Sequence, residues 1–222
     1  GATVDFRSPE VFDMVAMGQL IDAAVNQQPD GLVVSIPDAD ALGPSIQRAV
    51  EAGIPVISMN SGSDVAADLG ALLHVGQSEY DAGVAAGQRL AEMGGTKAND
   101  PTEVQSKVRA ALESDPEVDT VLGLGASLVG EPAVAAAEAL GRDDVMIASF
   151  DLSAGFLQAV ADGKAAFAID QQQFLQGYLP VAFLALNAQY GLMPGGDVPS
   201  GPNLVTQDSA AQVIELSAQG IR

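Results

Sequence analysis

Short apolar runs alternate along this chain with longer stretches in which apolar residues recur every three or four positions. The short runs are typical of buried strands, and the longer stretches of helices with one buried face. Strands that alternate with helices favour parallel pairing and right-handed crossovers. The pattern predicts an α/β fold with strands at 3–7, 32–36, 54–59, 72–76, 120–124, 146–150, 165–169 and 204–206, and helices at 8–27, 42–50, 82–93, 101–113, 132–140, 156–160, 174–190 and 210–216.

The order of elements near the N-terminus recurs in the middle of the chain. Ser8 and Pro9 are typical of a helix start, because serine caps the first turn and proline fits its first position. A helix, a turn with a proline and an acid, and an apolar strand occupy 8–36, and the same order returns at 101–124. This weak repeat predicts two similar lobes rather than one long sheet.

Polar residues follow several of the predicted strands. In open parallel sheets, ligands bind beyond the carboxyl ends of the strands. Asp, Asn and Gln side chains both accept from and donate to vicinal hydroxyls, which is what an uncharged sugar or polyol requires. The candidate ligand-binding residues are Asp38, Asn60, Ser61, Gln77, Ser127, Asp151 and Gln171; Glu79 and Asp170 lie at similar positions.

Composition removes several classes of function. The net charge of −20 argues against nucleic-acid binding and against anionic membrane surfaces. The chain has no cysteine, so disulfides, thiolate metal sites and cysteine nucleophiles are excluded. No window of about 18 uninterrupted apolar residues occurs, so we expect no insertion into a membrane.

Motifs for catalysis are weak. The segment 123–130 is glycine-rich and follows a strand, but its spacing differs from the dinucleotide fingerprint, and the chain has no phosphate loop. His74 is the only histidine and lies in an apolar strand, which favours a structural role over a Ser-His-Asp triad. With one histidine and scattered carboxylates, a metal site has few ligands. We expect no cofactor, no metal and no enzymatic activity, and we expect binding instead.

At this point several segments resemble the ribose-binding-protein type of periplasmic sugar-binding proteins. The resemblance runs in order through nearly the whole chain, which makes it more specific than any single motif. It is carried by 32–40, 53–60, 75–83, 147–151, 165–171 and 201–206.

The resemblance implies two Rossmann-like lobes with parallel sheets flanked by helices, joined by a hinge, that close on a monosaccharide or polyol. It implies a monomer in the periplasm or outside the cytoplasm that delivers its ligand to a membrane ABC permease. Interlobe crossings are implied near Gln77, Gln171 and Thr206. The expected lobes are therefore 1–77 with 172–203, and 78–171 with 204–222.

Carried over by position, Asn60 stands where the family has a sugar-binding Asp, and Ser61 where ribose binders have Arg. Asp151 and Gln171 match ligand-binding residues of the second lobe. The loop 125–127, which includes Ser127, lacks the usual Asn. These departures point away from ribose and toward another sugar, a polyol or a related small polar molecule.

The family also has a strand and helix before Thr3 and a strand-helix-strand block between Ala98 and Asn99. We therefore expect the complete protein to contain segments that this chain lacks. Two alternatives remain: the effector-binding core of a sugar-responsive transcription regulator, and a Rossmann-type enzyme that uses a nucleotide.

Overall fold

The computed structural model describes residues 1–92 and 104–222. The chain divides into two compact units, which we call unit 1 (Gly1–Glu79 and Gln173–Ser200) and unit 2 (Tyr80–Gln172 and Gly201–Arg222). The chain thus changes unit after residues 79, 172 and 200. The sequence placed these crossings after 77, 171 and 203.

Unit 1 contains a four-stranded sheet in the order β1-β2-β3-β7, in which every neighbouring pair is parallel. Its elements are α1 (Met14–Val25), β1 (Leu32–Ser35), α2 (Ala39–Glu51), β2 (Val56–Asn60), β3 (His74–Gly76), α7 (Gln173–Tyr190) and β7 (Val198–Pro199).

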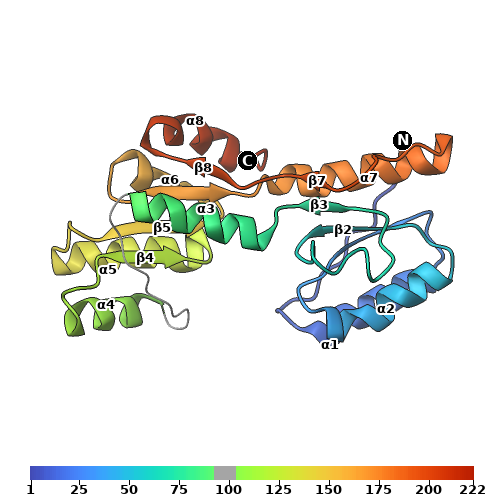
Figure 1. Ribbon diagram of the computed structural model, residues 1–222, viewed down its shortest axis with the longest axis horizontal. Coiled ribbons are helices and arrows are strands. Elements are labelled where there is room, and N and C mark those ends of the chain that lie inside the picture. The colour runs from blue at the N-terminus through green and yellow to red at the C-terminus, as the bar shows by residue number, and fades with distance from the viewer. Residues whose placement is uncertain (93–103) are drawn as a thin grey trace. The chain divides into compact units, whose positions relative to one another are not determined.

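Helices cover both faces of the sheet of unit 1 (Figure 1). Side chains of neighbouring strand residues point to opposite faces. Accordingly, Val56 packs in a cluster with residues of α1 and α2, whereas Ile57 packs in a second cluster with residues of α7. This two-sided burial explains why two consecutive residues of β2, Val56 and Ile57, are both apolar rather than alternating with polar ones.

Unit 2 contains a second four-stranded sheet, in the order β4-β5-β6-β8. The first three strands are parallel, and β8 runs antiparallel to β6. Its elements are α3 (Glu79–Glu92), α4 (Val104–Ser114), β4 (Thr120–Gly123), the π-helical turn η1 (Ala126–Gly130), α5 (Glu131–Leu140), β5 (Met146–Phe150), α6 (Ala154–Ala161), β6 (Phe167–Asp170), β8 (Asn203–Val205) and α8 (Gln207–Ala218).

The main core of unit 2 joins residues of α4, α5, α6 and α8 to one face of its sheet. Phe156 and Leu157 of α6 lie at its centre and have no exposed surface. A smaller cluster on other strand residues includes Ala86 of α3 together with Ala148, Phe167 and Ile169. Both faces of this sheet are therefore also buried.

Two predictions for the first residues are wrong. No strand forms at 3–7, and the first helix begins at Met14 rather than near Ser8. Asp13 is the cap, because its Oδ1 accepts hydrogen bonds from the backbone N–H groups of Val15 (2.8 Å) and Ala16 (3.1 Å). Residues 3–7 do not pair with β1, which is the end strand of its sheet among the described residues. Without a paired neighbour they form no strand.

The end of the chain corrects two further expectations. The segment 193–202, where the sequence predicts neither a strand nor a helix, contains β7. The parallel pairing of β7 with β3 is extended by a hydrogen bond from the Ser200 N–H to the Gly76 carbonyl (2.8 Å). The strand predicted at 204–206 is antiparallel rather than parallel. The junction between Ala98 and Asn99 and the helix start predicted at 99–102 lie outside the described residues.

The core of unit 2 leads to a first prediction. Phe156→Ala removes a side chain with 0% exposure and should lower the free energy of unfolding by about 3–5 kcal/mol, through lost burial and a residual cavity. Urea unfolding measures this loss. The matched control is Phe12→Ala, at a side chain that is 85% exposed. Equal losses in the two variants would contradict the position of Phe156 in the core.

Candidate functional site

The candidate site residues of unit 1 centre on Asn60, the last residue of β2. Its backbone is left-handed, with a φ of 61°, a conformation that Asn tolerates better than most residues. Its Oδ1 accepts hydrogen bonds from the hydroxyls of Ser35 (3.4 Å) and Ser61 (3.2 Å). Its Nδ2 donates to Oε1 of Gln176 (3.3 Å). All these partners are neutral, so the group suits uncharged hydroxyls.

A tight backbone approach holds this strand end in place. The Ile36 N–H donates to the Ser61 carbonyl (3.0 Å), which ties the residues after β1 to those after β2. Gly62 follows with a φ of 98°, and a Cβ there would lie 2.6 Å from Cβ of Ile36. Only glycine fits this position, and Asn60 and Ser61 are thereby fixed directly beyond the sheet.

Unit 2 places Asp151 in the corresponding position, directly after β5, which like β2 is the second strand of its sheet. Asp151 is also left-handed, with a φ of 66°, and its N–H donates to the Ile169 carbonyl (2.9 Å). Nε2 of Gln171 donates to Oδ1 of Asp151 at 2.6 Å. The structure therefore brings together two residues that the sequence proposed from separate strands.

A half-buried ion pair holds the residue that precedes Gln171. Asp170, the last residue of β6, is fully buried, and its Oδ2 accepts from Nε (2.9 Å) and Nη2 (2.6 Å) of Arg222. Its Oδ1 accepts from the Gln172 N–H (2.7 Å). Because both oxygens are engaged, the backbone on either side of Gln171 is held in one conformation.

The other candidate residues have different surroundings. Asp38 is exposed and is the N-cap of α2, where its Oδ1 accepts from the Ala41 N–H (3.0 Å). Ser127 is exposed within η1. Gln77 follows β3 and is 1% exposed, and neither polar atom of its side chain has a hydrogen-bond partner among the described residues. Capping accounts for Asp38, whereas Gln77 is the buried polar group in most need of a partner.

Sequence reasoning missed three residues that form hydrogen bonds around Asn60. Ser35 and Gln176 bond to Asn60 directly, and Ser200 bonds to Gln176. Ser35 lies within an apolar strand, and Gln176 lies in a helix of mostly apolar residues, so neither follows the end of a strand. The available signal was a polar residue at a position that periodicity assigns to the core. In α7 that position is Gln176, which is 2% exposed.

His74 is buried in β3, as its apolar surroundings indicated. Its Nδ1 is 2.8 Å from Oγ of Ser58 on the neighbouring strand, and its Nε2 has no partner among the described residues. Asp197 accepts from the backbone N–H of His74 (2.7 Å), not from its ring. Ser58 has no exposed surface. A catalytic triad would need a carboxylate at the ring and an accessible serine, and neither is found here.

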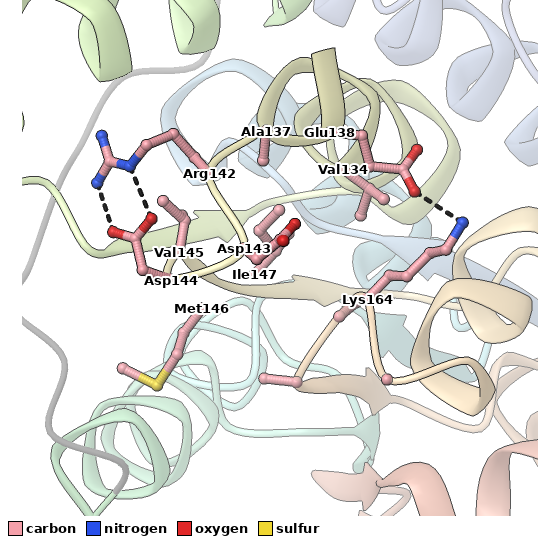
Figure 2. A pocket seen from close by; sticks show the side chains of 13 residues that line it. Val134, Ala137, Glu138, Arg142, Asp143, Asp144, Val145, Met146, Ile147 and Lys164 are labelled. Atoms are coloured by element: carbon pink, nitrogen blue, oxygen red, sulfur yellow. Dashed lines mark hydrogen bonds and ion pairs between the residues drawn. The ribbon is translucent and has the colours of Figure 1, made fainter. Parts of the chain in front are cut away.

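A hollow of about 360 Å³ lies at the opposite end of the sheet of unit 2, around the amino ends of β5 and β6 (Figure 2). The ion pairs Arg142–Asp144 (2.7 Å) and Lys164–Glu138 (2.7 Å) lie along its wall. Arg142 also donates to the carbonyls of Leu112, Pro116 and Val118. The charged side chains of this hollow are therefore engaged in structural contacts. The hollow lies at the amino ends of the strands, whereas the candidate site residues lie at the carboxyl ends.

The described part of the chain contains neither a metal-ion cluster nor a helix suited to span a membrane. No group of three or more His, Cys, Asp or Glu side chains in 1–92 and 104–222 could hold a metal ion. Within the same residues, no helix combines the length and hydropathy of a membrane-spanning segment.

The burial of His74 predicts a dependence of stability on pH. Burial lowers the pKa of His74 below its usual 6.5, and the nearby Asp197 and Asp64 carboxylates oppose part of this effect. The unfolded chain therefore binds a proton at higher pH than the folded one. This contribution to stability is complete above the unfolded pKa and is lost as the pH falls, in a window that opens near the usual pKa of 6.5 and extends down to the lower pKa of the folded state.

The variant His74→Asn keeps a polar group near Ser58 but removes the titrating ring. Urea unfolding at a series of pH values should show a steeper loss of unfolding free energy for the unmodified protein than for the variant across that window. Parallel curves for the two proteins would show that His74 is not responsible.

Comparisons with known proteins agree with this architecture. The sequence matches the family described as periplasmic binding protein domain in two segments, 1–99 and 95–191. A carbohydrate transporter from Acidothermus cellulolyticus, whose crystal structure contains myo-inositol, is 32% identical, with a TM-score of 0.85 over 95% of this chain and 85% of that chain. A periplasmic ribose ABC transporter from Conexibacter woesei is 25% identical, with a TM-score of 0.72 over 94% of this chain and 83% of that chain.

A curated relative is the xylose/arabinose-binding protein of Sulfolobus acidocaldarius, which is 26% identical over an alignment of 226 positions that covers 80% of this chain. The chain spans only 56% of the length of that relative. The α/β fold with mainly parallel sheets flanked by helices, predicted from the sequence, is confirmed by the family and structure matches. The resemblance found in the sequence is confirmed as well, and the chain belongs to the periplasmic binding protein domain family.

Proposed function

We propose that this protein is the substrate-binding component of an ABC-type importer and that it binds an uncharged monosaccharide or polyol. The observation that carries the proposal is the matched pair of strand ends. Asn60, the last residue of β2, and Asp151, directly after β5, each occupy a left-handed backbone position at the end of the second strand of a sheet. Each is held by neighbouring polar side chains.

The chemistry of the two groups supports a polyhydroxyl ligand. The Asn60 group offers an amide and two hydroxyls, and the Asp151 group offers a carboxylate beside the amide of Gln171. A carboxylate accepts from a ligand hydroxyl, and an amide N–H donates to one. Buried groups of this kind discriminate strongly, because a ligand without the matching hydroxyl leaves them unpaired.

The relatives support a sugar or polyol as the class of ligand, but they do not identify one compound. The structural relative at 32% identity was solved with myo-inositol, and the curated relative is called a xylose/arabinose-binding protein. These names favour an importer component over a transcription regulator or a nucleotide-dependent enzyme. We therefore propose binding rather than catalysis. In this proposal the protein is a monomer that acts outside the cytoplasmic membrane and binds to a membrane permease. The hinged closure of two lobes on the ligand belongs to the same proposal.

Titration calorimetry with myo-inositol, D-xylose and L-arabinose tests this function. The unmodified protein should bind at least one of them, and Asp151→Asn should weaken that binding by roughly tenfold to a hundredfold, as expected for a lost hydrogen bond to a charged acceptor. The matched control is Asp143→Asn, at an exposed carboxylate in the hollow at the other end of β5. It should leave affinity unchanged.

Two results would overturn the proposal. Failure of all three compounds to bind the unmodified protein would remove the ligand class. Equal loss of affinity in Asp151→Asn and Asp143→Asn would show that the carboxyl end of β5 has no special role.

A further inference from the structure

A continuous series of hydrogen bonds runs from Asn60 to the point where the chain leaves unit 1. Nδ2 of Asn60 donates to Oε1 of Gln176 (3.3 Å), and Nε2 of Gln176 donates to Oγ of Ser200 (2.9 Å). The backbone N–H of Ser200 donates to the Gly76 carbonyl (2.8 Å), at the end of β3. Ser200 is the last residue of unit 1 before the chain crosses to unit 2.

Packing alone does not explain Gln176. The helix α7 has no charged residue and buries Gln176 and Pro180. Gln176 and Ser200 are 2% and 3% exposed. A buried amide destabilises the fold if its hydrogen bonds are not made, so a hydrophobic residue would be the simpler choice at this position. The amide is instead satisfied at both ends, by one residue of the candidate site and one of the crossing.

These bonds also orient the side chain of Asn60. Two hydroxyls donate to its Oδ1, and one of its two Nδ2 hydrogens is directed to Gln176. The second Nδ2 hydrogen has no partner among the described residues. An Asp at this position would place a carboxylate oxygen against Oε1 of Gln176. It would be accommodated only if the amide of Gln176 turned over and Ser200 donated in place of accepting.

We propose that Gln176 is the positioning residue for Asn60. It holds the Asn60 amide so that one N–H is offered to a hydroxyl oxygen of the ligand, and it joins this group to the crossing at Ser200. The proposal rests on the proposed function, in which Asn60 contacts a sugar or polyol. Gln176 itself acts through Asn60 and does not touch the ligand.

A double-mutant cycle tests this dependence with the compound of the three, myo-inositol, D-xylose or L-arabinose, that binds the unmodified protein most tightly. Gln176→Met keeps the length of the side chain but removes the hydrogen bonds to Asn60 and Ser200, and should weaken binding roughly tenfold when Asn60 is present. In the Asn60→Ala background the same change should weaken binding by less than about twofold. Equal losses in both backgrounds would overturn the proposal, because a general structural effect of Gln176 does not need Asn60.

Gln189→Met is the matched control, since Gln189 is an exposed glutamine of the same helix. It should leave affinity unchanged in both backgrounds. Urea unfolding of each variant separates a loss of folded protein from a loss of affinity in the folded protein.

A ligand-free measurement keeps the two proposals distinguishable. In ¹⁵N NMR spectra, Gln176→Met should shift the side-chain amide signals of Asn60 and speed their hydrogen exchange, whereas Gln189→Met should do neither. Unchanged Asn60 signals in Gln176→Met would overturn the positioning role. If these signals respond while none of the three compounds binds, the positioning of Asn60 by Gln176 is supported and the proposed ligand class is not.

Discussion

Parallel pairing of three consecutive strands in each sheet is the constraint on which the rest of this structure depends. Strands β1, β2 and β3 pair in parallel, and so do β4, β5 and β6. Each connection must run from the carboxyl end of one strand back to the amino end of the next, so it crosses a face of the sheet. The crossover helices cover one face of each sheet, while α7 in unit 1 and α3 in unit 2 cover the other. In each sheet the carboxyl ends of these parallel strands lie along the same edge. Asn60 and Asp151 lie at that edge of their own sheets, Asn60 as the last residue of β2 and Asp151 directly after β5.

The cost of burying polar groups then decides how the edge is built. An unpaired buried amide or hydroxyl costs about 1–3 kcal/mol, so the structure joins such groups to one another. Gln176 is bonded at both ends, and Asp170 is paired with Arg222. Nε2 of His74 is buried without a partner among the described residues, and so are both polar side-chain atoms of Gln77, two residues before the first crossing. Polar residues in this interior therefore mark positions where orientation matters more than burial.

The two units meet this constraint with the same order of elements but different chemistry. In unit 1 the strand end carries a neutral group of one amide and two hydroxyls, whereas in unit 2 it carries a carboxylate held by a glutamine. The sheets also end differently, because β7 joins in parallel and β8 in antiparallel orientation. The internal repeat seen in the sequence thus corresponds to a repeated architecture in which each copy presents its own hydrogen-bonding groups.

The sequence by itself determined the alternation of helices and strands, the apolar positions of both cores and the candidate residues that directly follow strands, such as Asn60 and Asp151. These features follow from local periodicity and from the chemistry of neighbouring residues. Only the tertiary structure decided that 3–7 is not a strand, that 198–199 is one, and that β8 is antiparallel, because pairing depends on a partner distant in the chain. It also decided the contact of Gln176 with Asn60, 116 residues apart. No local pattern encodes a hydrogen bond between a helix interior and a strand end, since it forms only when the packing of α7 on β2 brings them together.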